Sequence, residues 1–134
     1  MLRVTEGVHA HAFAPADRAA FLSTAWVVSA RCDRAGVRLQ GAPLVPPGGG
    51  ALQSEGMPRG AVEVAGDGEV IVVLPDGPTT GGYPVIACVA TVDFPRLGQL
   101  RPREAVRMAA IDFATARRLL AEREAWLDRE VPRP

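Results

Sequence analysis

Short runs of apolar and β-branched residues, separated by glycine and proline, dominate the hydrophobic pattern of the chain. Runs of this length that are bounded by turn residues are typical of β-strands. The pattern predicts strands at residues 2–5, 26–28, 37–39, 61–64, 69–74, 85–92 and 105–111. Gly66-Asp67-Gly68 predicts a tight turn that joins two of these strands as a hairpin. The Pro- and Gly-rich stretch 43–50 predicts a loop.

Two segments have the pattern of a helix instead. Pro15 suits the first position of a short helix, and Phe21 and Leu22 give that helix an apolar face. Asp112 is a good N-cap for a longer helix near the end of the chain. The longer helix is predicted to bury a stripe of four residues: Ala116, Leu119, Leu120 and Leu127. Beyond it, residues 131–134 are predicted to fray.

The fold class follows from this balance of elements. Strands outnumber helices, and glycine and proline turns separate them, which favours a mainly β fold over an alternating parallel α/β fold. We expect a closed or nearly closed β-barrel with one short and one longer peripheral helix. The length of 134 residues fits a single domain, residues 1–134.

Composition and charge exclude several function classes. The formal net charge is zero, so the chain lacks the basic footprint of a nucleic-acid-binding protein. The apolar stretches are too short to span a bilayer and no signal segment is evident, so we expect a soluble cytoplasmic protein that binds neither nucleic acid nor membrane. All fifteen basic residues are arginine, which excludes a Schiff-base or phosphate-loop lysine in this chain.

Metal-ligand patterns are also weak. The two cysteines, Cys32 and Cys88, lie far apart and form neither a metal-ligand spacing nor a redox pair. His9 and His11 alternate, but no carboxylate or thiolate lies near them in sequence to complete a site. We expect no metal and a structural or surface role for the two histidines.

The connection between strands 69–74 and 85–92 is the least ordinary segment of the chain. It is longer than a plain hairpin turn requires, and it contains Asp76 followed by Thr79-Thr80-Gly81-Gly82-Tyr83-Pro84. Adjacent glycines let backbone amides approach a ligand, and the threonines and the tyrosine offer hydroxyl groups. From the residues alone, a functional loop and a structural loop are both open.

Two further groups carry candidate chemistry. In Ser54-Glu55-Gly56, Ser54 is a candidate to bind an anion or a carbonyl and Glu55 is a candidate base, although a turn held by local hydrogen bonds explains the same residues. Arg34 and Arg38 flank Gly36 and are candidates to pair with a carboxylate, phosphate or carbonyl of a substrate. The alternative is that both are surface arginines in weak ion pairs.

Taken together and in order, these motifs resemble the family of the 5-oxoprolinase C subunit, also called allophanate hydrolase subunit 2. The similarity extends over residues 2–120. Its motifs are DRAGVRLQG at 33–41, SEG at 54–56, GAVEV at 60–64, TTGGYP at 79–84 and RLGQLRP at 96–102. The chain departs from the family at Glu63, where glutamine is usual, and at Gly77-Pro78, where Arg-Gln is usual.

The resemblance implies a cyclophilin-like β-barrel that corresponds to the second of two halves of the family's protein. The same module forms the carboxyltransferase part of urea carboxylase. Family members work with a B subunit, which is also called allophanate hydrolase subunit 1, and with one further subunit to open 5-oxoproline to glutamate, using ATP. A relative binds a histidine-kinase inhibitor of the B-subunit type. The missing amino-terminal half and the B subunit are therefore the expected partners.

Two function hypotheses follow from the resemblance. In the first, the chain is part of a multi-subunit hydrolase that acts on an amide or urea-like substrate and is inactive alone. Arginine and loop amides hold a carboxylate or carboxybiotin, hydroxyl groups orient the amide or urea-like group, and Glu55 or Asp76 transfers protons. The wall of the cleft consists of Arg34, Arg38, Ser54, Glu55, Asp76, Thr79, Thr80, Gly81, Gly82 and Tyr83.

The second hypothesis is a docking or regulatory module without chemistry of its own, which binds a B-subunit-like protein of the kinase-inhibitor type. In both cases we expect no cofactor within this chain. ATP or carboxybiotin belongs elsewhere in the complex, because the sequence has no phosphate-binding loop.

Overall fold

The computed structural model describes residues 1–131. Its β-strands are β1 (Leu2–Glu6), β2 (Trp26–Val28), β3 (Gly36–Gln40), β4 (Glu55–Gly56), β5 (Ala61–Val64), β6 (Val70–Val73), β7 (Thr80–Gly81), β8 (Val85–Val89), β9 (Ala105–Val106) and β10 (Met108–Ala110). Its α-helices are α1 (Pro15–Ser23), α2 (Phe94–Leu97) and α3 (Phe113–Glu130), and its 3-10 helices are η1 (Ala10–Ala12), η2 (Pro47–Gly50) and η3 (Thr91–Asp93).

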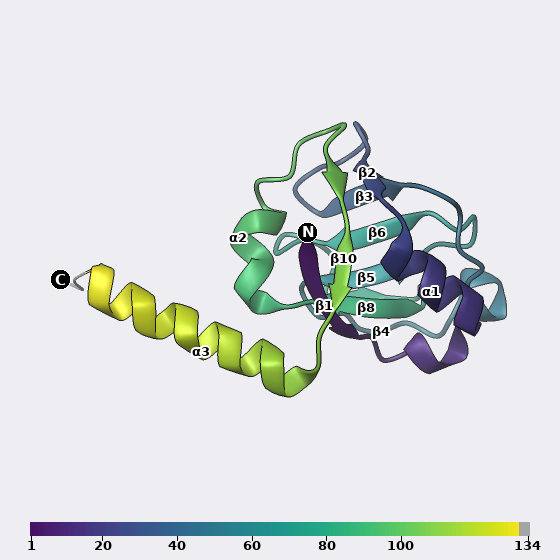
Figure 1. Cartoon of the computed structure of the whole chain (residues 1–134). Coiled ribbons are helices and arrows are strands. Elements are labelled where there is room, and N and C mark those ends of the chain that lie inside the picture. The colour runs from purple at the N-terminus through teal and green to yellow at the C-terminus, as the bar shows by residue number, and fades with distance from the viewer. Residues whose placement is uncertain (132–134) are drawn as a thin grey trace.

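Eight strands form one sheet in the order β10-β1-β8-β5-β6-β3-β2-β9. The two end strands, β9 and β10, are consecutive in the chain and are separated only by Arg107. β9 pairs antiparallel with β2, and β10 pairs parallel with β1. One segment therefore hydrogen-bonds to both edges of the sheet, which closes it into a barrel (Figure 1). The predicted mainly β barrel is confirmed, and the predicted strand 105–111 is the segment that closes it.

The core lies inside the barrel because side chains alternate between the two faces of each strand. Val62 and Val64 of β5 and Val70 and Val72 of β6 point inward and are fully buried. Trp26 is also buried, and its indole Nε1 donates a hydrogen bond to the carbonyl oxygen of Phe21, which attaches α1 to β2. The inward apolar positions alone fill the core, so the outward positions are free to serve other purposes.

The outer face of the sheet carries a second, smaller apolar cluster. Ala61, Val73 and Val85 are buried there, and Met57 packs against them. The predicted hairpin between β5 and β6 is present, and Gly68 in its turn has a φ of 83°, in the left-handed region that glycine adopts without strain. Apolar side chains on the outer face of the sheet must be shielded from water. The loop between β3 and β5 and the loop between β6 and β8, which contain β4 and β7, lie over this cluster.

The predicted short helix is α1, and the predicted longer helix is α3. Asp112 is the N-cap of α3, as predicted, and its Oδ1 accepts a hydrogen bond from the amide of Thr115 at 2.6 Å. The predicted buried stripe of α3 is only partly present, because Ala116, Leu119, Leu120 and Leu127 are half-buried and none of them is fully buried. None of the residues of α3 is buried, because the helix leaves the barrel after its first turns, which lie beside η3 (Figure 1).

One other feature differs from the prediction, and one predicted feature cannot be compared with the described residues. The strand predicted at 85–92 ends at Val89, because the chain turns into η3 and the short helix α2, which the hydrophobic pattern did not indicate. The predicted fraying of residues 131–134 lies outside the described residues, apart from Val131. Among residues 1–131, no helix has both the length and the hydrophobicity needed to cross a bilayer.

Asp93 attaches the turn that follows β8 to strand β1. Its carboxylate is buried and accepts hydrogen bonds from the Arg3 amide at 2.7 Å and from Arg3 Nε at 3.0 Å, and it also pairs with Arg3 Nη2. Burial opposes the charged form of Asp93, but the hydrogen bonds and the charge of Arg3 prevail and lower its pKa. This ion pair connects η3 to β1 from opposite ends of the chain.

We predict that Asp93→Asn lowers the free energy of unfolding at pH 7 by about 1–3 kcal/mol, because the buried charged acceptor is lost. A lowered folded-state pKa stabilises the protein above the ordinary value of 3.8, and this contribution disappears as pH falls through the folded-state pKa. Urea denaturation should show that the difference in free energy of unfolding between variant and parent is smaller at pH 3 than at pH 7. Asp76→Asn, at an exposed position, is the control, and an unchanged gap would contradict the assignment.

Candidate functional site

A two-stranded ribbon, β4 and β7, lies outside the barrel and brings two predicted site segments together. Glu55 pairs with Gly81 and Gly56 pairs with Thr80 in antiparallel register. Backbone hydrogen bonds continue the ribbon on both sides, from the Leu52 amide to the Gly82 carbonyl at 2.7 Å and from the Met57 amide to the Thr79 carbonyl at 2.8 Å. The segment 54–56 and the segment 79–84 therefore form one structural unit.

Gly81 determines how closely this ribbon approaches the barrel. A Cβ atom at Gly81 would lie 2.9 Å from Oε1 of Glu63 and 2.6 Å from Cε of Met57. Both distances are shorter than a normal contact, so the backbone at residue 81 lies directly over the Glu63 carboxyl group of β5. The absence of a side chain at residue 81 lets the backbone lie against the ends of the Glu63 and Met57 side chains, whereas the predicted approach of the glycine amides to a ligand stays a prediction.

His9 and Glu55 form the most distinct polar contact of the ribbon. His9 Nδ1 accepts a hydrogen bond from the Val85 amide at 3.0 Å, so in the neutral imidazole the proton resides on Nε2. His9 Nε2 lies 3.3 Å from Oε1 of Glu55. The His9 side chain is 19% exposed and that of Glu55 is 44% exposed. A fixed imidazole thus faces a carboxylate that remains open to solvent.

Glu63 is the buried carboxyl group of the site. Its exposed fraction is 6%, and burial raises its pKa above the ordinary value. No hydrogen bond or ion pair joins it to any of residues 1–131. It also lines a pocket of about 180 Å³ with Asp33, Arg38 and Pro78.

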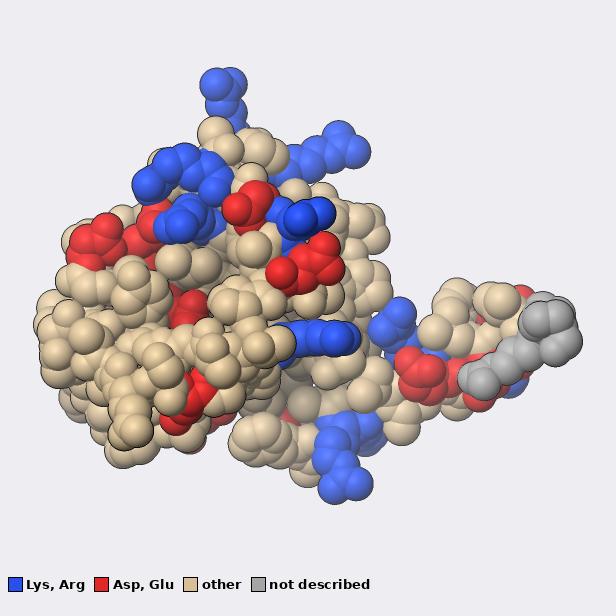
Figure 2. Space-filling view, turned by 180° about the vertical axis from the view of Figure 1, so that it is seen from behind, with Lys and Arg blue, Asp and Glu red and all other residues tan. Residues whose placement is uncertain are grey.

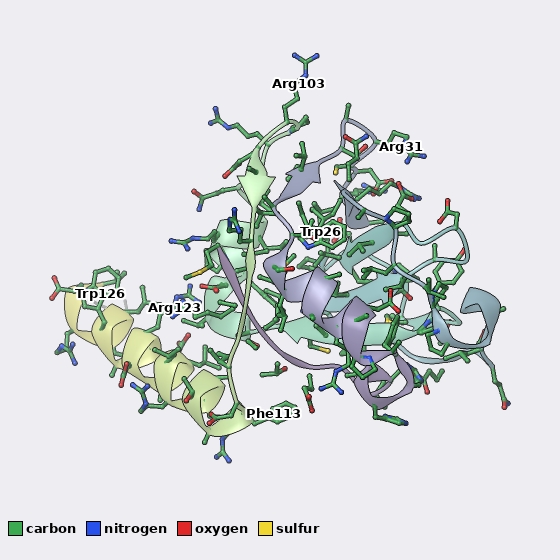
Figure 3. The ribbon with its side chains drawn as sticks, turned by 45° about the vertical axis from the view of Figure 1, so that its right-hand side comes forward. Trp26, Arg31, Arg103, Phe113, Arg123 and Trp126 are labelled. Carbon is green, nitrogen blue, oxygen red and sulfur yellow. The ribbon has the colours of Figure 1, made fainter. Side chains whose placement is uncertain are left out.

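The two predicted arginines behave differently. Arg38 lies on β3, lines the same pocket as Glu63, and pairs with Glu69, which also pairs with Arg31. Arg34 is exposed in the loop before β3 and makes no hydrogen bond or ion pair within the described part of the chain. Figure 2 shows basic and acidic side chains intermingled at the top of the barrel, and in Figure 3 Arg31 points outward near that end.

The remaining predicted residues lie at the rim. Ser54, Thr79 and Thr80 are exposed on the ribbon, and the Tyr83 side chain is 43% exposed. Asp76 is exposed in the turn after β6 and makes no hydrogen bond or ion pair within residues 1–131. That turn contacts the loop of Arg34, because the Leu74 amide donates to the Ala35 carbonyl at 2.9 Å. Of the two predicted proton-transfer groups, Glu55 has a partner side chain and Asp76 has none.

Two residues of the site were not among the predicted site residues, namely His9 and Glu63. His9 had been assigned a structural or surface role because no carboxylate is near it in sequence, and the carboxylate that it meets is 46 positions away. Glu63 alternates with apolar residues in β5, and a carboxyl group inside such a strand was the available signal. Among the described residues, no cluster of three or more His, Cys, Asp or Glu side chains suits a metal ion.

Comparison with known proteins gives the class to which this barrel and ribbon belong. A family model described as carboxyltransferase domain, subdomain A and B, matches residues 1–110. The chain is 38% identical over 99 residues to the C subunit of 5-oxoprolinase from Escherichia coli strain K12, which covers 74% of this chain and 32% of that protein. It is 29% identical over 125 residues to urea amidolyase of Lachancea kluyveri, covering 87% of this chain and 7% of that protein.

A solved structure gives the same result. The crystal structure of K. lactis urea amidolyase superposes with a TM-score of 0.88 at 25% identity, over 96% of this chain and 8% of that one. The chain therefore belongs to the carboxyltransferase-domain family, subdomain A and B, and is related to the C subunit of 5-oxoprolinase. It spans about a third of the length of the E. coli protein that it matches.

We predict that Glu63→Gln raises the free energy of unfolding by about 1–3 kcal/mol at pH 8, because the buried site no longer holds a charge. The raised folded-state pKa means that glutamate costs no stability below the ordinary value of 4.5 and that stability is lost as pH rises through the folded-state pKa. Thermal melts should therefore show that the melting temperature of Glu63→Gln, relative to that of the parent, increases from pH 4 to pH 8. Glu122→Gln on α3 is the control, and a pH-independent difference would contradict the burial argument.

Proposed function

We propose that this chain forms one wall of the reaction site of a multi-subunit, carboxyltransferase-related enzyme that acts on an amide or urea-like substrate. The two substrate types come from the names of its relatives, a 5-oxoprolinase and a urea amidolyase. The chain is inactive alone, because it spans only about a third of its 5-oxoprolinase relative and its polar groups face outward from one side of a ribbon.

The contact between His9 and Glu55 is the observation that carries this proposal. His9 is held by the Val85 amide at Nδ1, its Nε2 lies 3.3 Å from Oε1 of Glu55, and the Glu55 side chain is 44% exposed. A carboxylate oriented by an imidazole and open on one side is a suitable general base for the N–H of an amide or urea. We therefore assign proton transfer to Glu55, with His9 as the positioning residue.

The rim of the ribbon supplies binding groups for the same substrate. The hydroxyl groups of Ser54, Thr79, Thr80 and Tyr83 are exposed beside Glu55 on the paired segments. Such hydroxyls donate to a carbonyl or accept from an N–H. Arg34 and Asp76 lie on two loops that contact each other through the hydrogen bond from the Leu74 amide to the Ala35 carbonyl. ATP or carboxybiotin would be bound by other parts of the complex, since this chain has no lysine and no phosphate-binding loop.

A docking module is the second candidate, and the structure of α3 favours it. This helix has no buried residue, and Phe113 and Trp126 on it are 66% and 52% exposed (Figure 3). A helix that extends from the barrel with exposed aromatic side chains at both ends is available for contact with another protein. Docking to a B-subunit-like protein is compatible with the enzymatic proposal, but it alone requires no chemistry at Glu55.

We predict that the chain, combined with the missing amino-terminal half and the other 5-oxoprolinase subunits, supports ATP-dependent turnover of 5-oxoproline. Glu55→Gln should lower kcat by about 10²–10⁴-fold, the usual contribution of a general base. His9→Asn should lower kcat by less and shift the pH profile, because a positioning residue acts through Glu55. Turnover and size-exclusion profiles of the same mixtures provide the measurements.

Asp76→Asn is the matched control for this experiment, since it makes the same chemical change at the other predicted carboxylate. Full activity of Asp76→Asn with loss in Glu55→Gln supports the assignment, and the reverse result refutes it. If the chain co-elutes with the B subunit but no substrate is turned over, the enzymatic proposal fails and the docking module stands.

A further inference from the structure

Helix α3 has an apolar stripe that continues after the helix has left the barrel. The stripe follows the three- and four-residue spacing of one helical face, and it consists of Phe113, Ala116, Leu119, Leu120, Trp126 and Leu127. In Figure 3, Phe113 lies at the barrel end of the helix and Trp126 near its far end, and both side chains are more than half exposed. Most of the stability of a helix in a protein comes from packing of its apolar face, yet no residue of this stripe is fully buried.

A groove at the start of α3 lies on the same side of the helix as the stripe. Its volume is about 260 Å³, and its walls are residues 88–91 at the end of β8 and, on the helix, Phe113, Ala116 and Leu120. Two arginines also line it, Arg59 before β5 and Arg117 on α3. Both are exposed, and neither makes a hydrogen bond or an ion pair within the described part of the chain. The groove therefore combines apolar walls with positive charge, and no acidic residue lines it.

The charges along α3 are divided between its two halves. Residues 113–121 include two arginines and no acidic residue, whereas residues 122–130 include four acidic residues and two arginines. The half near the barrel is therefore basic, like the groove beside it, and the far half is acidic. Two copies of the helix that run antiparallel place each basic half against an acidic half, which is the complementarity that protein interfaces favour. A parallel pair would place like charges together.

Arg117 and Glu124 make this complementarity specific. They are seven residues apart, so they lie within about 20° of each other around the helix, beside the apolar stripe. Both are exposed, and neither makes a hydrogen bond or an ion pair within residues 1–131. In an antiparallel pair with its two-fold axis near Leu120, Arg117 of each copy lies opposite Glu124 of the other. The same axis brings Phe113 of each copy close to Trp126 of the other, because residue 120 is midway between them.

We propose that two copies of this chain associate through α3, with the helices antiparallel and the far half of each helix covering the groove at the start of the other. Trp126 and Leu127 of one copy pack on the apolar walls of that groove, and Glu124 pairs with Arg117. A two-fold axis makes every such contact twice, so one helix supplies both halves of the interface. The interface uses neither the ribbon nor Glu55, so it is independent of the proposed function.

Charge reversal tests the pairing directly. Arg117→Glu and Glu124→Arg each replace the two opposite-charge pairs of the dimer with like-charge pairs, and each should weaken self-association by about tenfold or more. The two variants mixed in equal amounts should form a heterodimer as tight as the parent dimer, because opposite charges then face each other in both pairs. Sedimentation equilibrium of the full chain measures the dissociation constants.

Arg118→Glu is the matched control, because it makes the same change one residue away, on the side of the helix where Arg118 pairs with Glu122. It should self-associate like the parent. Trp126 gives a second measurement, since Trp26, the only other tryptophan, is 1% exposed and is shielded in either state. Quenching of tryptophan fluorescence by acrylamide should therefore fall as the protein concentration rises and Trp126 becomes covered.

Three results would overturn the proposal. The first is a parent chain that stays monomeric up to millimolar concentration. The second is a mixture of the two charge variants that does not recover the affinity of the parent although both variants fold, as circular dichroism would show. The third is equal weakening by Arg118→Glu and Arg117→Glu. A monomeric chain that instead loses binding to a B-subunit-like protein in Arg117→Glu assigns α3 to that docking role. Failure of turnover in the reconstituted complex refutes only the proposed function.

Discussion

Closure of the barrel by one short segment, residues 105–110, is the constraint on which the rest of the structure depends. The segment satisfies the backbone hydrogen bonds of two strands that would otherwise be open edges, β1 and β2. Open edges expose unpaired amide and carbonyl groups and invite pairing with other chains. With both edges closed, valine, leucine and tryptophan side chains fill the interior from all sides. The outer face is then the only place where the sheet presents polar chemistry.

The outer face of the barrel has two different roles. The ribbon of β4 and β7 shields an apolar cluster and the Glu63 carboxyl group, and the same ribbon presents Glu55 and the hydroxyl groups on its exposed side. Gly81 allows the close approach of the ribbon to Glu63, because a side chain there would require the ends of the Met57 and Glu63 side chains to move. The buried carboxyl costs stability in its charged form, and such a cost is typical of groups kept for binding or catalysis.

The chain corresponds to a small part of its larger relatives, and this is consistent with a surface that contacts other parts of an assembly. The chain corresponds to 8% of the K. lactis urea amidolyase chain and to about a third of the E. coli 5-oxoprolinase relative. α3 extends from the barrel with no fully buried residue, and its aromatic side chains Phe113 and Trp126 are exposed (Figure 3). Helices of this composition usually pack on something, so the reaction site and the helix both favour an assembly.

The sequence by itself determined the class of fold and most of its elements, because strand periodicity, glycine and proline turns and the Asp112 cap are local signals. It also singled out 54–56 and 79–84, because such turn residues are unusual in a plain connection. Only the tertiary structure decided that these two segments pair, that His9 meets Glu55, and that Glu63 is buried with no hydrogen-bond partner among residues 1–131. These contacts join residues distant in the chain, and no local pattern encodes them. For the same reason the four apolar residues predicted to be buried in α3 are only half-buried, since amphipathic spacing shows which face can pack but not how much of a neighbour is present.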